Sequence, residues 1–405
     1  MESDSRAGGP RLLVLGAGPA QLGLLEAARR RGAFVAVADR DPAAPGFALA
    51  DRRCILSTED EPALERLVGA LRIDGIVSPG TDWPVGVAAR IAERAGLPHP
   101  ISPATAVLAT NKLRQREALA AAGVPQPRSW VIGAADDPPA IDGPVVVKAP
   151  DRQGQKGLAL VEDAAALPEA IEAARAVARS GLALVEELVD GPEVTVVGFS
   201  VGGEFTALTV TDREVAEPPA FGVALAHVFP SFNRGQSPDT SSEDVAERAV
   251  AALGITDGPS YTQLRIGPGG PEVIEVAARL GGGHDAELVE VAVGVDLNAL
   301  AIDAALGAPV APPRPRARVG GAVTRFLVAP PGTLASVDVP SDLEGVEQVR
   351  IYRAAGHVFE PLRRGADRAG AVLAVGADRA EALARADRAA ERIRFRIANV
   401  AVEAR

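Results

Sequence analysis

The 405-residue sequence contains a single cysteine, Cys54. One cysteine cannot form an internal disulfide bond, and such usage is typical of proteins in a reducing compartment. The opening segment, MESDSRAGGP, lacks the apolar core of a secretory signal. The sequence also lacks an uninterrupted apolar run long enough to cross a bilayer. We therefore expect a cytoplasmic protein that has no membrane partner.

The sequence has fewer positively charged than negatively charged residues. The chain has 42 lysines and arginines against 53 aspartates and glutamates, which gives a net charge of −11. This balance argues against nucleic acid as a partner, although it leaves room for a local basic cleft. The length and the 47% hydrophobic content predict two to four domains with real cores. A homodimer is the default expectation for the assembly, because dimers are the commonest soluble oligomers.

Lysine is also scarce. The sequence has only three lysines, Lys112, Lys148 and Lys156, and all lie within one 45-residue window. Lysine places a compact charge on a flexible stem, which suits a single phosphate oxygen better than the planar fork of arginine does. The window is therefore a candidate phosphate site, and chance clustering is the alternative.

The segment YTQLRIGPGGPEVIEVAARLGGGHD, residues 261–285, predicts an antiparallel β-hairpin. Two runs with high strand propensity flank residues 268–270, which we expect to form a three-residue loop. Placing Gly267 opposite Pro271 then determines which side chains face each other. The pairs expected across the hairpin are Thr262–Val276, Gln263–Glu275 and Leu264–Ile274.

Side-chain alternation divides this hairpin into two faces. Gln263, Glu275 and Ala277 share a polar face, on which an amide and a carboxylate can converge. Oxygen ligands of this kind suit Mg²⁺, which usually takes one or two protein carboxylates together with phosphates. A solvated face on a half-exposed hairpin is the alternative. The opposite face, which requires a core, contains Leu264, Ile274 and Val276.

A fixed positive charge and a run of glycines follow the hairpin directly. Arg279 is succeeded by Gly281, Gly282 and Gly283. Positive charge beside exposed backbone N–H groups is a common way to bind anions. The hairpin and its continuation together suggest a metal–nucleotide site.

Residues 11–39 predict a β-α-β unit with glycines in its first turn and Asp39 at the end of its second strand. This order is typical of dinucleotide-binding proteins. However, Gln21 stands where the fingerprint requires its third glycine, so the dinucleotide signal is weak. The expected elements are strands at 11–15 and 33–38 and a helix at 20–31.

Further α/β units follow, and Thr81 and Asp82 lie in the loop after a strand expected at 75–78. In an open parallel sheet, small ligands bind at the carboxyl ends of the strands, which makes both residues candidate substrate contacts. Helix capping is their alternative role. The other elements expected here are a strand at 54–56 and helices at 62–71 and 85–95.

A second hairpin is expected at residues 145–161, with Lys148 on its first strand. Its polar loop, residues 151–157, contains two glycines whose backbone N–H groups can fold over a triphosphate. It is not a P-loop, because the required glycine and lysine spacing is absent and the loop joins two strands. We expect the loop to be mobile without nucleotide.

The remaining periodic segments complete the expected structure. The segment 319–405 contains no motif that suggests chemistry, so we expect it to be structural. The other expected helices lie at 112–122, 168–179, 285–293, 298–305 and 379–398, and the other strands at 183–189, 193–199, 322–328, 346–351 and 372–375.

The order of these features resembles the ATP-grasp superfamily, in particular carboxylate–amine ligases of the L-amino acid ligase type. A lysine-bearing strand and glycine loop precede an acidic strand, the Gln/Glu hairpin and an arginine. The resemblance covers nearly the whole chain and implies an α/β fold of three domains. These are a Rossmann-like domain at 1–105, a two-lobed α+β ATP-grasp clamp at 106–312 with its small lobe at about 125–188, and an α+β domain at 319–405.

The resemblance also implies the cofactors, ATP and Mg²⁺ (or Mn²⁺), and roles for individual residues. Arg279 would steady the acyl-phosphate chemistry, and Gln263 and Glu275 would bind the metal. Among the ATP residues, the lysines and the loop would hold phosphates, residues 186–189 would lie against adenine, and Glu193 would lie near the ribose. The residues expected around ATP are Lys112, Lys148, Gln153, Gly154, Gln155, Lys156, Gly157, Glu186, Glu187, Leu188, Val189 and Glu193.

Two positions depart from the family pattern. Gln263 stands where glutamate is common, and Ala277 stands where a ligating asparagine is common. Ala277 has no ligand atom, so either the second metal ion is held by Glu275, phosphates and water, or catalysis has been lost.

The resemblance implies that ATP phosphorylates a small carboxylate and that an amine then attacks the acyl phosphate. Positioning and charge neutralisation are the main requirements of such phosphoryl transfer. His284 is a candidate substrate or phosphate contact, with helix capping as its alternative, and His227 is expected to pack. A carboxylating enzyme of the purine-biosynthesis type and a non-catalytic ATP-binding remnant are the alternative functions.

Overall fold

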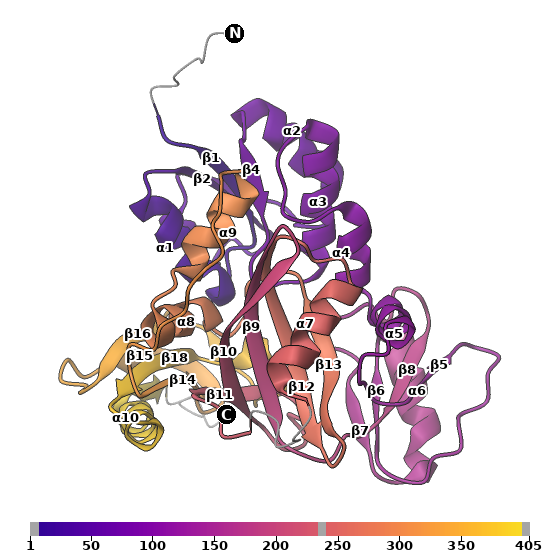
Figure 1. Ribbon diagram of the computed structural model, residues 1–405. Coiled ribbons are helices and arrows are strands. Elements are labelled where there is room, and N and C mark those ends of the chain that lie inside the picture. The colour runs from indigo at the N-terminus through magenta and orange to yellow at the C-terminus, as the bar shows by residue number, and fades with distance from the viewer. Residues whose placement is uncertain (1–7, 234–239, 399–405) are drawn as a thin grey trace, which may run out of the picture.

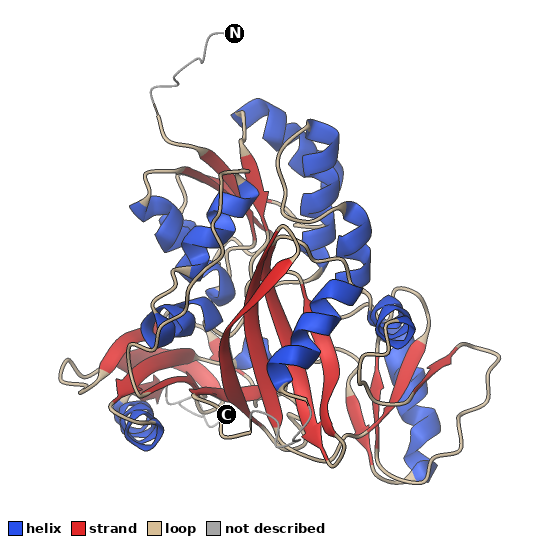
Figure 2. Ribbon diagram, viewed as in Figure 1, coloured by secondary structure: helices blue, strands red, loops and turns tan. Residues whose placement is uncertain are grey.

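The computed structural model describes residues 8–233 and 240–398. Within those residues the strands form four sheets. In Figure 1 the N-terminal unit lies at the top, a small lobe lies on the right, and the C-terminal strands lie at the lower left. Figure 2 shows long strands through the middle of the molecule with helices packed around them.

The N-terminal sheet is parallel and has the order β3-β2-β1-β4. Helices cover both of its faces, so strands β1, β2 and β4 are largely apolar, whereas the edge strand β3 begins with two exposed arginines. Leu12 and Val14 of β1 pack with α1, whereas Leu13 and Leu15 pack with α2 and α3. The elements are β1 (Arg11–Leu15), α1 (Leu22–Arg30), β2 (Phe34–Asp39), β3 (Arg52–Ile55), α2 (Glu61–Leu71), β4 (Gly75–Val77) and α3 (Trp83–Ala95), with short 3₁₀ turns at Pro19–Gln21 and Pro45–Leu49.

The small lobe is an antiparallel sheet with the order β5-β8-β6-β7. Val145 and Val147 of β6 point into a core beneath α6, and Lys148 ends the strand. The loop 151–157 joins β6 to β7, as predicted. The elements are β5 (Ser129–Ile132), β6 (Val145–Lys148), β7 (Ala159–Val161), α6 (Leu167–Val177) and β8 (Ala183–Glu187), with a 3₁₀ turn at Ala164–Ala166.

The largest sheet has eight strands in the order β13-β12-β9-β10-β11-β14-β18-β16. Strand β11 pairs directly with β14, so the C-terminal strands continue the sheet that β9 to β13 form. The division into three domains stays a prediction. The strands are β9 (Glu193–Val201), β10 (Glu204–Val215), β11 (Ala224–Phe229), β12 (Gly258–Gly267), β13 (Gly270–Ala277), β14 (Gly321–Leu327), β16 (Val346–Ile351) and β18 (Gly370–Gly376).

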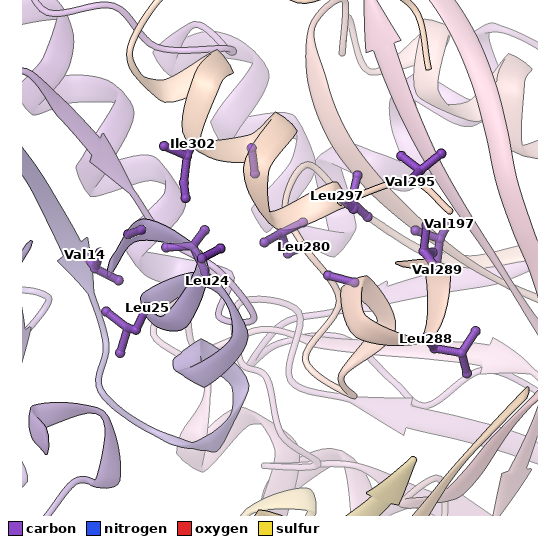
Figure 3. Close-up of a cluster of buried hydrophobic side chains, with 14 of the residues drawn as sticks. Val14, Leu24, Leu25, Val197, Leu280, Leu288, Val289, Val295, Leu297 and Ile302 are labelled. Carbon is purple, nitrogen blue, oxygen red and sulfur yellow. The ribbon is translucent and has the colours of Figure 1, made fainter. Parts of the chain in front are cut away.

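The two faces of β9 pack into two different hydrophobic cores. Val194 and Val196 pack with Leu264 under one layer of helices. Val197 and Phe199 join the cluster drawn in Figure 3, in which α8 and α9 lie between the large sheet and the N-terminal sheet. The N-terminal unit is therefore fixed to the large sheet by a shared core. The helices are α4 (Pro103–Thr110), α5 (Lys112–Ala121) and α7 (Ser242–Ala252) on the first face, and α8 (Asp285–Val293) and α9 (Leu297–Ala305) on the second.

The C-terminal segment adds a helix and a small sheet. Helix α10 (Arg379–Arg392) packs alanines against β14 and β18. The small sheet contains β15 (Gly332–Asp338), β17 (Val358–Phe359) and β19 (Arg394–Ile397), and a 3₁₀ turn, η4, spans Gly365–Asp367. Among the described helices, none combines the length and apolar character needed to cross a bilayer.

The hairpin of β12 and β13 confirms two predicted pairs and corrects the third. Gln263 faces Glu275 and Thr262 faces Val276, but Leu264 faces Val273 instead of Ile274. The loop is one residue shorter than predicted, because Gly267 pairs with Gly270, and a bulge after Gln263 restores the register. Ile274 was therefore wrongly placed in the core.

The C-terminal helix was predicted too long. It ends at Arg392, and the alternating sequence RFRI forms β19 in place of a further helical turn. Ile393 has an extended backbone and is buried, so the chain turns there into the hydrophobic core. The last predicted helix residue, Ala398, lies beyond β19. The strands that were not predicted from the sequence are β5, β10, β11, β15, β17 and β19.

Candidate active site

A cavity of about 440 Å³ lies where the N-terminal unit, the small lobe, the large sheet and the C-terminal segment meet. Nine of its lining residues are lysine or arginine and five are aspartate or glutamate, although the chain as a whole is acidic. A local basic cleft, which the acidic composition left possible, is therefore present. The predicted site residues on its wall are Thr81, Asp82, Lys112, Lys148, Gln153, Gly154, Gln155, Lys156, Glu186, Glu187, Leu188, Val189, Glu193, Gln263, Glu275 and Arg279.

Lys148 is held by a buried acid. Its Nζ donates to Glu186, and the other carboxylate oxygen of Glu186 accepts from Arg116 Nε at 2.6 Å. Burial alone would raise the pKa of Glu186, but the charges of Lys148 and Arg116 lower it to about 2. Glu186 is 2% exposed. Glu186 is therefore a buried partner that positions Lys148. Residues 187–189, which follow it, line the cavity.

Lys112 reaches the cavity from the first turn of α5. Asn111 caps this helix, because its Oδ1 accepts from the N–H groups of Leu113 and Arg114. Lys112 Nζ donates to Glu275 Oε1 at 2.7 Å and to the carbonyl of Arg152 at 3.1 Å. Burial would raise the pKa of Glu275, but Lys112 holds it below its usual value.

The glycine loop is attached at both of its sides. Gln153 Oε1 accepts from the N–H of Asp82 at 2.6 Å, and Gln155 Oε1 accepts from the N–H of Gly365 at 3.1 Å. Gln155 has φ of 61°, a left-handed conformation that is costly for a residue with a side chain. The loop thus bridges the N-terminal unit and the C-terminal segment. Gly157 lies at its base and is not part of the cavity wall.

Arg279 forms an ion pair with Asp82 on the cavity wall. Its Nε and Nη2 both donate to Asp82 Oδ1, at 2.6 and 2.5 Å. Asp82 stands at the N-cap of α3 but makes no capping hydrogen bond, so its carboxylate serves Arg279. The hydroxyl of Thr81 accepts from Gln21 Nε2 at 3.3 Å.

The hairpin pair borders a second acid. Gln263 Nε2 donates to Glu193 Oε2 at 3.0 Å, and Arg213 Nη1 donates to the same oxygen at 2.5 Å. Because of the bulge, Ile274 and Glu275 both lie on the cavity wall. Glu193 therefore binds Gln263 and Arg213 together beside the predicted metal position.

The donor atoms suit a metal ion that arrives with its nucleotide. Among the described residues there is no cluster of three or more His, Cys, Asp or Glu side chains that could hold a metal alone. Glu275 supplies one carboxylate and Gln263 one amide oxygen, side by side in a cavity lined by lysines and arginines. This set fits Mg²⁺ coordinated mainly by phosphates and water.

The two histidines have locations opposite to those expected from the sequence, because His227 lines the cavity and His284 does not. His284, at the start of α8, is 5% exposed and does not line the cavity, but its Nε2 lies 2.5 Å from the hydroxyl of Tyr352, which does. It makes no capping hydrogen bond. His227, which was expected only to pack, lines the cavity, and its Nδ1 contacts Asp285 Oδ1 at 2.6 Å.

Further cavity residues could not be found from the sequence. His227 lies on β11, which had no predicted strand, and Arg213 lies on the equally unpredicted β10. The C-terminal segment was expected to carry no chemistry, yet it contributes part of the wall. Its contributions are Tyr352, Arg353, Gly365, Ala366 and Arg368.

Two known proteins resemble this chain, one over most of its length and the other over about a third of it. An uncharacterized protein of Sinorhizobium fredii (strain NBRC 101917 / NGR234), y4rH, is 32% identical over 397 residues, which cover 92% of this chain and 80% of that protein. Human carnosine synthase 1 is 32% identical over 133 residues, which cover 32% of this chain and 16% of that protein.

Fold and family comparisons agree with these relatives. The crystal structure of L-amino acid ligase from Bacillus licheniformis superimposes with a TM-score of 0.80 at 22% identity, covering 97% of this chain and all of that one. The family described as L-amino acid ligase C-terminal domain 2 matches residues 325–398. The chain shares a family with y4rH over most of both sequences, and the domain match, the fold and the similarity to carnosine synthase 1 identify that family as the ATP-grasp carboxylate–amine ligases.

Proposed function

We propose that this protein joins a small carboxylate, with an amino acid as the first candidate, to an amine through an acyl phosphate, and releases ADP and phosphate. The observation that carries the proposal is the composition of one cavity wall. It contains lysines, a glycine loop and the Gln263–Glu275 pair. It also contains arginines and a histidine that contacts an aspartate.

In this proposal residues 1–105 form the Rossmann-like domain, residues 106–312 the clamp and residues 319–405 the C-terminal domain. ATP would lie with its adenine against residues 187–189 and with its phosphates near Lys112 and Lys148. Both lysines are already paired with acids, which positions them and keeps their charges in the cavity. Phosphoryl transfer depends mainly on such positioning and on neutralised charge.

Glu275 and Gln263 are the residues that would hold Mg²⁺ on the nucleotide. The ion would neutralise phosphate charge when bound. Lys112 would then exchange part of its contact with Glu275 for a phosphate oxygen, since both groups line the same wall.

In the first chemical step a carboxylate oxygen of the acid attacks the γ-phosphorus, and the bond to ADP breaks. Arg279, held by Asp82, would stabilise the negative charge on the acyl phosphate. In the second step the amine nitrogen attacks the acyl carbon, inorganic phosphate leaves, and the nitrogen loses a proton.

His227 is the group that we assign to that proton. Burial would raise the pKa of Asp285, but His227 and the N–H of Gly283 keep it below its usual value, so Asp285 remains ionised. An ionised Asp285 accepts a hydrogen bond from Nδ1 of His227, which leaves Nε2 as the proton acceptor. Positioning of a base by a carboxylate is a general device for this purpose.

The decisive test is ADP release from ATP and Mg²⁺ over a grid of small carboxylates and amines, with mass spectrometry of the products. We expect ADP release to require both substrates and to match amide formation. Dependence on bicarbonate would instead identify a carboxylating enzyme. ATP binding without ADP release over the whole grid would favour the non-catalytic alternative, which the residues Gln263 and Ala277 motivate.

A further inference from the structure

Tyr352 of the C-terminal segment is a cavity residue that takes no part in the steps proposed so far. It lines the cavity, is 6% exposed, and packs its ring with Ala224, Phe326 and Ala371. Its hydroxyl is not left in this apolar cluster, because it lies 2.5 Å from Nε2 of His284. A buried phenol usually has such a hydrogen-bond partner. A histidine behind the wall therefore holds a phenol that belongs to the wall.

Charged side chains fix the ring of His284 in turn. Its Nδ1 lies 3.6 Å from Glu287 Oε1, and Arg350 Nη2 donates to the same oxygen at 3.3 Å. Arg350 also donates to both carboxylate oxygens of Glu26, at 2.9 and 2.7 Å. Burial would raise the pKa of Glu287, but His284 and Arg350 keep it below its usual value, so Glu287 is ionised. An ionised carboxylate beside Nδ1 favours a proton on that nitrogen.

This arrangement determines how the phenol can act. With the proton on Nδ1, Nε2 of the neutral ring accepts the hydrogen bond from the Tyr352 hydroxyl. Burial raises the pKa of Tyr352, so the group is a neutral phenol with one proton and two oxygen lone pairs. Its oxygen is within electrostatic range of two other wall residues, Arg353 and Arg368. Toward the cavity the hydroxyl is therefore an acceptor, which suits an N–H group of a substrate.

Tyr352 is a neighbour of His227, the proton acceptor assigned above. Asp285 contacts His227, and the residue before it in the sequence, His284, contacts Tyr352. Two adjacent residues at the start of α8 thus support two residues of the wall. Phe326 contacts His227 edge-on, with ring centroids 5.7 Å apart, and packs with Tyr352. A hydrogen-bond acceptor consequently lies beside the group that takes the proton from the amine.

We propose that the hydroxyl oxygen of Tyr352 accepts a hydrogen bond from the attacking amine, and that His284 positions the hydroxyl for this contact. The inference deepens the proposed function and rests on it. Tyr352 would be a further catalytic residue of the second chemical step, and His284 a positioning residue that acts through it.

The geometry of a primary amine explains why two acceptors are useful. Its nitrogen has two N–H groups and one lone pair, so holding both N–H groups directs the lone pair at the acyl carbon. Nε2 of His227 takes one proton. Tyr352 holds the other N–H and receives no proton, because its own proton stays on the hydrogen bond to His284. The C–N bond forms, the bond between the acyl carbon and the phosphate oxygen breaks, and the amide keeps the N–H that Tyr352 held.

The test makes the amine compete with hydroxylamine for the same acyl phosphate. Hydroxylamine attacks acyl phosphates without help from an enzyme, so the ratio of amide to hydroxamate reports the second step alone. The full-length protein is used with ATP, Mg²⁺ and an acid and amine that the substrate grid identifies. Tyr352→Phe keeps the ring and removes the hydroxyl. We expect this variant to lower the ratio about tenfold, the scale of one lost hydrogen bond, and to leave ADP release with hydroxylamine unchanged.

His284→Asn tests the positioning role. Asparagine tolerates the left-handed backbone at this position, where φ is 60°, but its side chain is too short to replace the imidazole. We expect a smaller fall in the ratio, and no further fall when this change is added to Tyr352→Phe, because both remove the same contact. Additive losses would contradict a role through Tyr352. His357→Asn is the matched control, since His357 follows Tyr352 in the same segment but does not line the cavity, and its ratio should be normal.

Three outcomes would overturn the inference. A normal ratio in Tyr352→Phe would show that the phenol oxygen does not hold the amine. Loss of amide and hydroxamate together would show that the hydroxyl serves the fold or the first step. Absence of ADP release from the unmodified protein with every acid and amine would overturn the proposed function, and this inference with it.

Discussion

Gln263 and Glu193 are joined by a hydrogen bond of 3.0 Å from the amide of one to the carboxylate of the other, at the predicted metal position. The sequence alone suggests that Gln263→Glu is harmless, since glutamate is the commoner ligand in the family. The structure changes that expectation. The substitution would bring a second carboxylate against Glu193, whose own charge is already paired with Arg213, so a further cation is needed to relieve the repulsion.

We therefore predict that the stability of Gln263→Glu depends on Mg²⁺. Its melting temperature should be lower than that of the unmodified protein in EDTA and should recover with Mg²⁺ and an ATP analogue. Gln263→Ala, which has no carboxylate, is the control and should not recover in this way. Equal melting of Gln263→Glu with and without the metal would contradict the assigned metal position.

Glu275→Gln removes the carboxylate of the hairpin pair. We expect turnover to fall by about 10²–10³-fold, the size of effect seen when a preorganised electrostatic contact is lost. The change also deprives Lys112 of its acidic partner. Turnover and ATP affinity should be measured together, and near-normal turnover in a verified ligase assay would show that Glu275 does not act in the reaction.

Lys148→Ala should weaken ATP binding by about 2–4 kcal/mol, because a buried charged partner of the phosphates is lost. Glu186 retains Arg116 as a partner in this variant, so the fold should be less affected than ATP binding. Titration calorimetry with an ATP analogue measures the affinity. Unchanged affinity would remove Lys148 from the phosphate site.

Glu186 should make unfolding depend on pH in the acidic range. Its pKa is lowered in the folded protein from 4.5 to about 2, so its stabilising contribution is fully present above about pH 4.5 and is lost as the pH falls toward 2. Glu186→Gln leaves Lys148 and Arg116 buried without their acid and should cost about 3–5 kcal/mol near neutral pH.

Urea unfolding at several pH values tests this assignment. The difference in unfolding free energy between the unmodified protein and Glu186→Gln should shrink between pH 4.5 and the lowest pH at which the protein stays folded. A difference that stays constant through this range would argue against an ionised Glu186.

The glycine loop should be more accessible when its two attachments are removed. Gln153→Ala and Gln155→Ala each lose a hydrogen bond to a separate part of the molecule. We expect faster proteolysis within residues 151–157 for both variants, and slower proteolysis of the unmodified protein with an ATP analogue. Gln155→Gly is an informative comparison, because it loses the same bond but relieves the left-handed backbone. Proteolysis rates that change neither with the ATP analogue nor with the substitutions would contradict a loop that closes over the nucleotide.

The sequence by itself determined the features that depend on neighbouring residues. Strand alternation around a short loop predicts that Gln263 faces Glu275. The predicted loop was one residue too long, but the bulge after Gln263 offsets that error, so the predicted pair is correct. Lys148 and its loop were likewise recognisable, since a strand, a glycine loop and a second strand are contiguous. Most helix bounds were within two residues because periodicity and caps are local signals.

Tertiary structure alone decided which distant residues meet. Arg279 pairs with Asp82, which is 197 positions away in the sequence. His227 of β11 contacts Asp285 of α8. Arg368 enters the cavity because β14 extends the large sheet and carries Phe326 beneath it. No local propensity records such meetings, because they follow from the packing of whole sheets around a shared core.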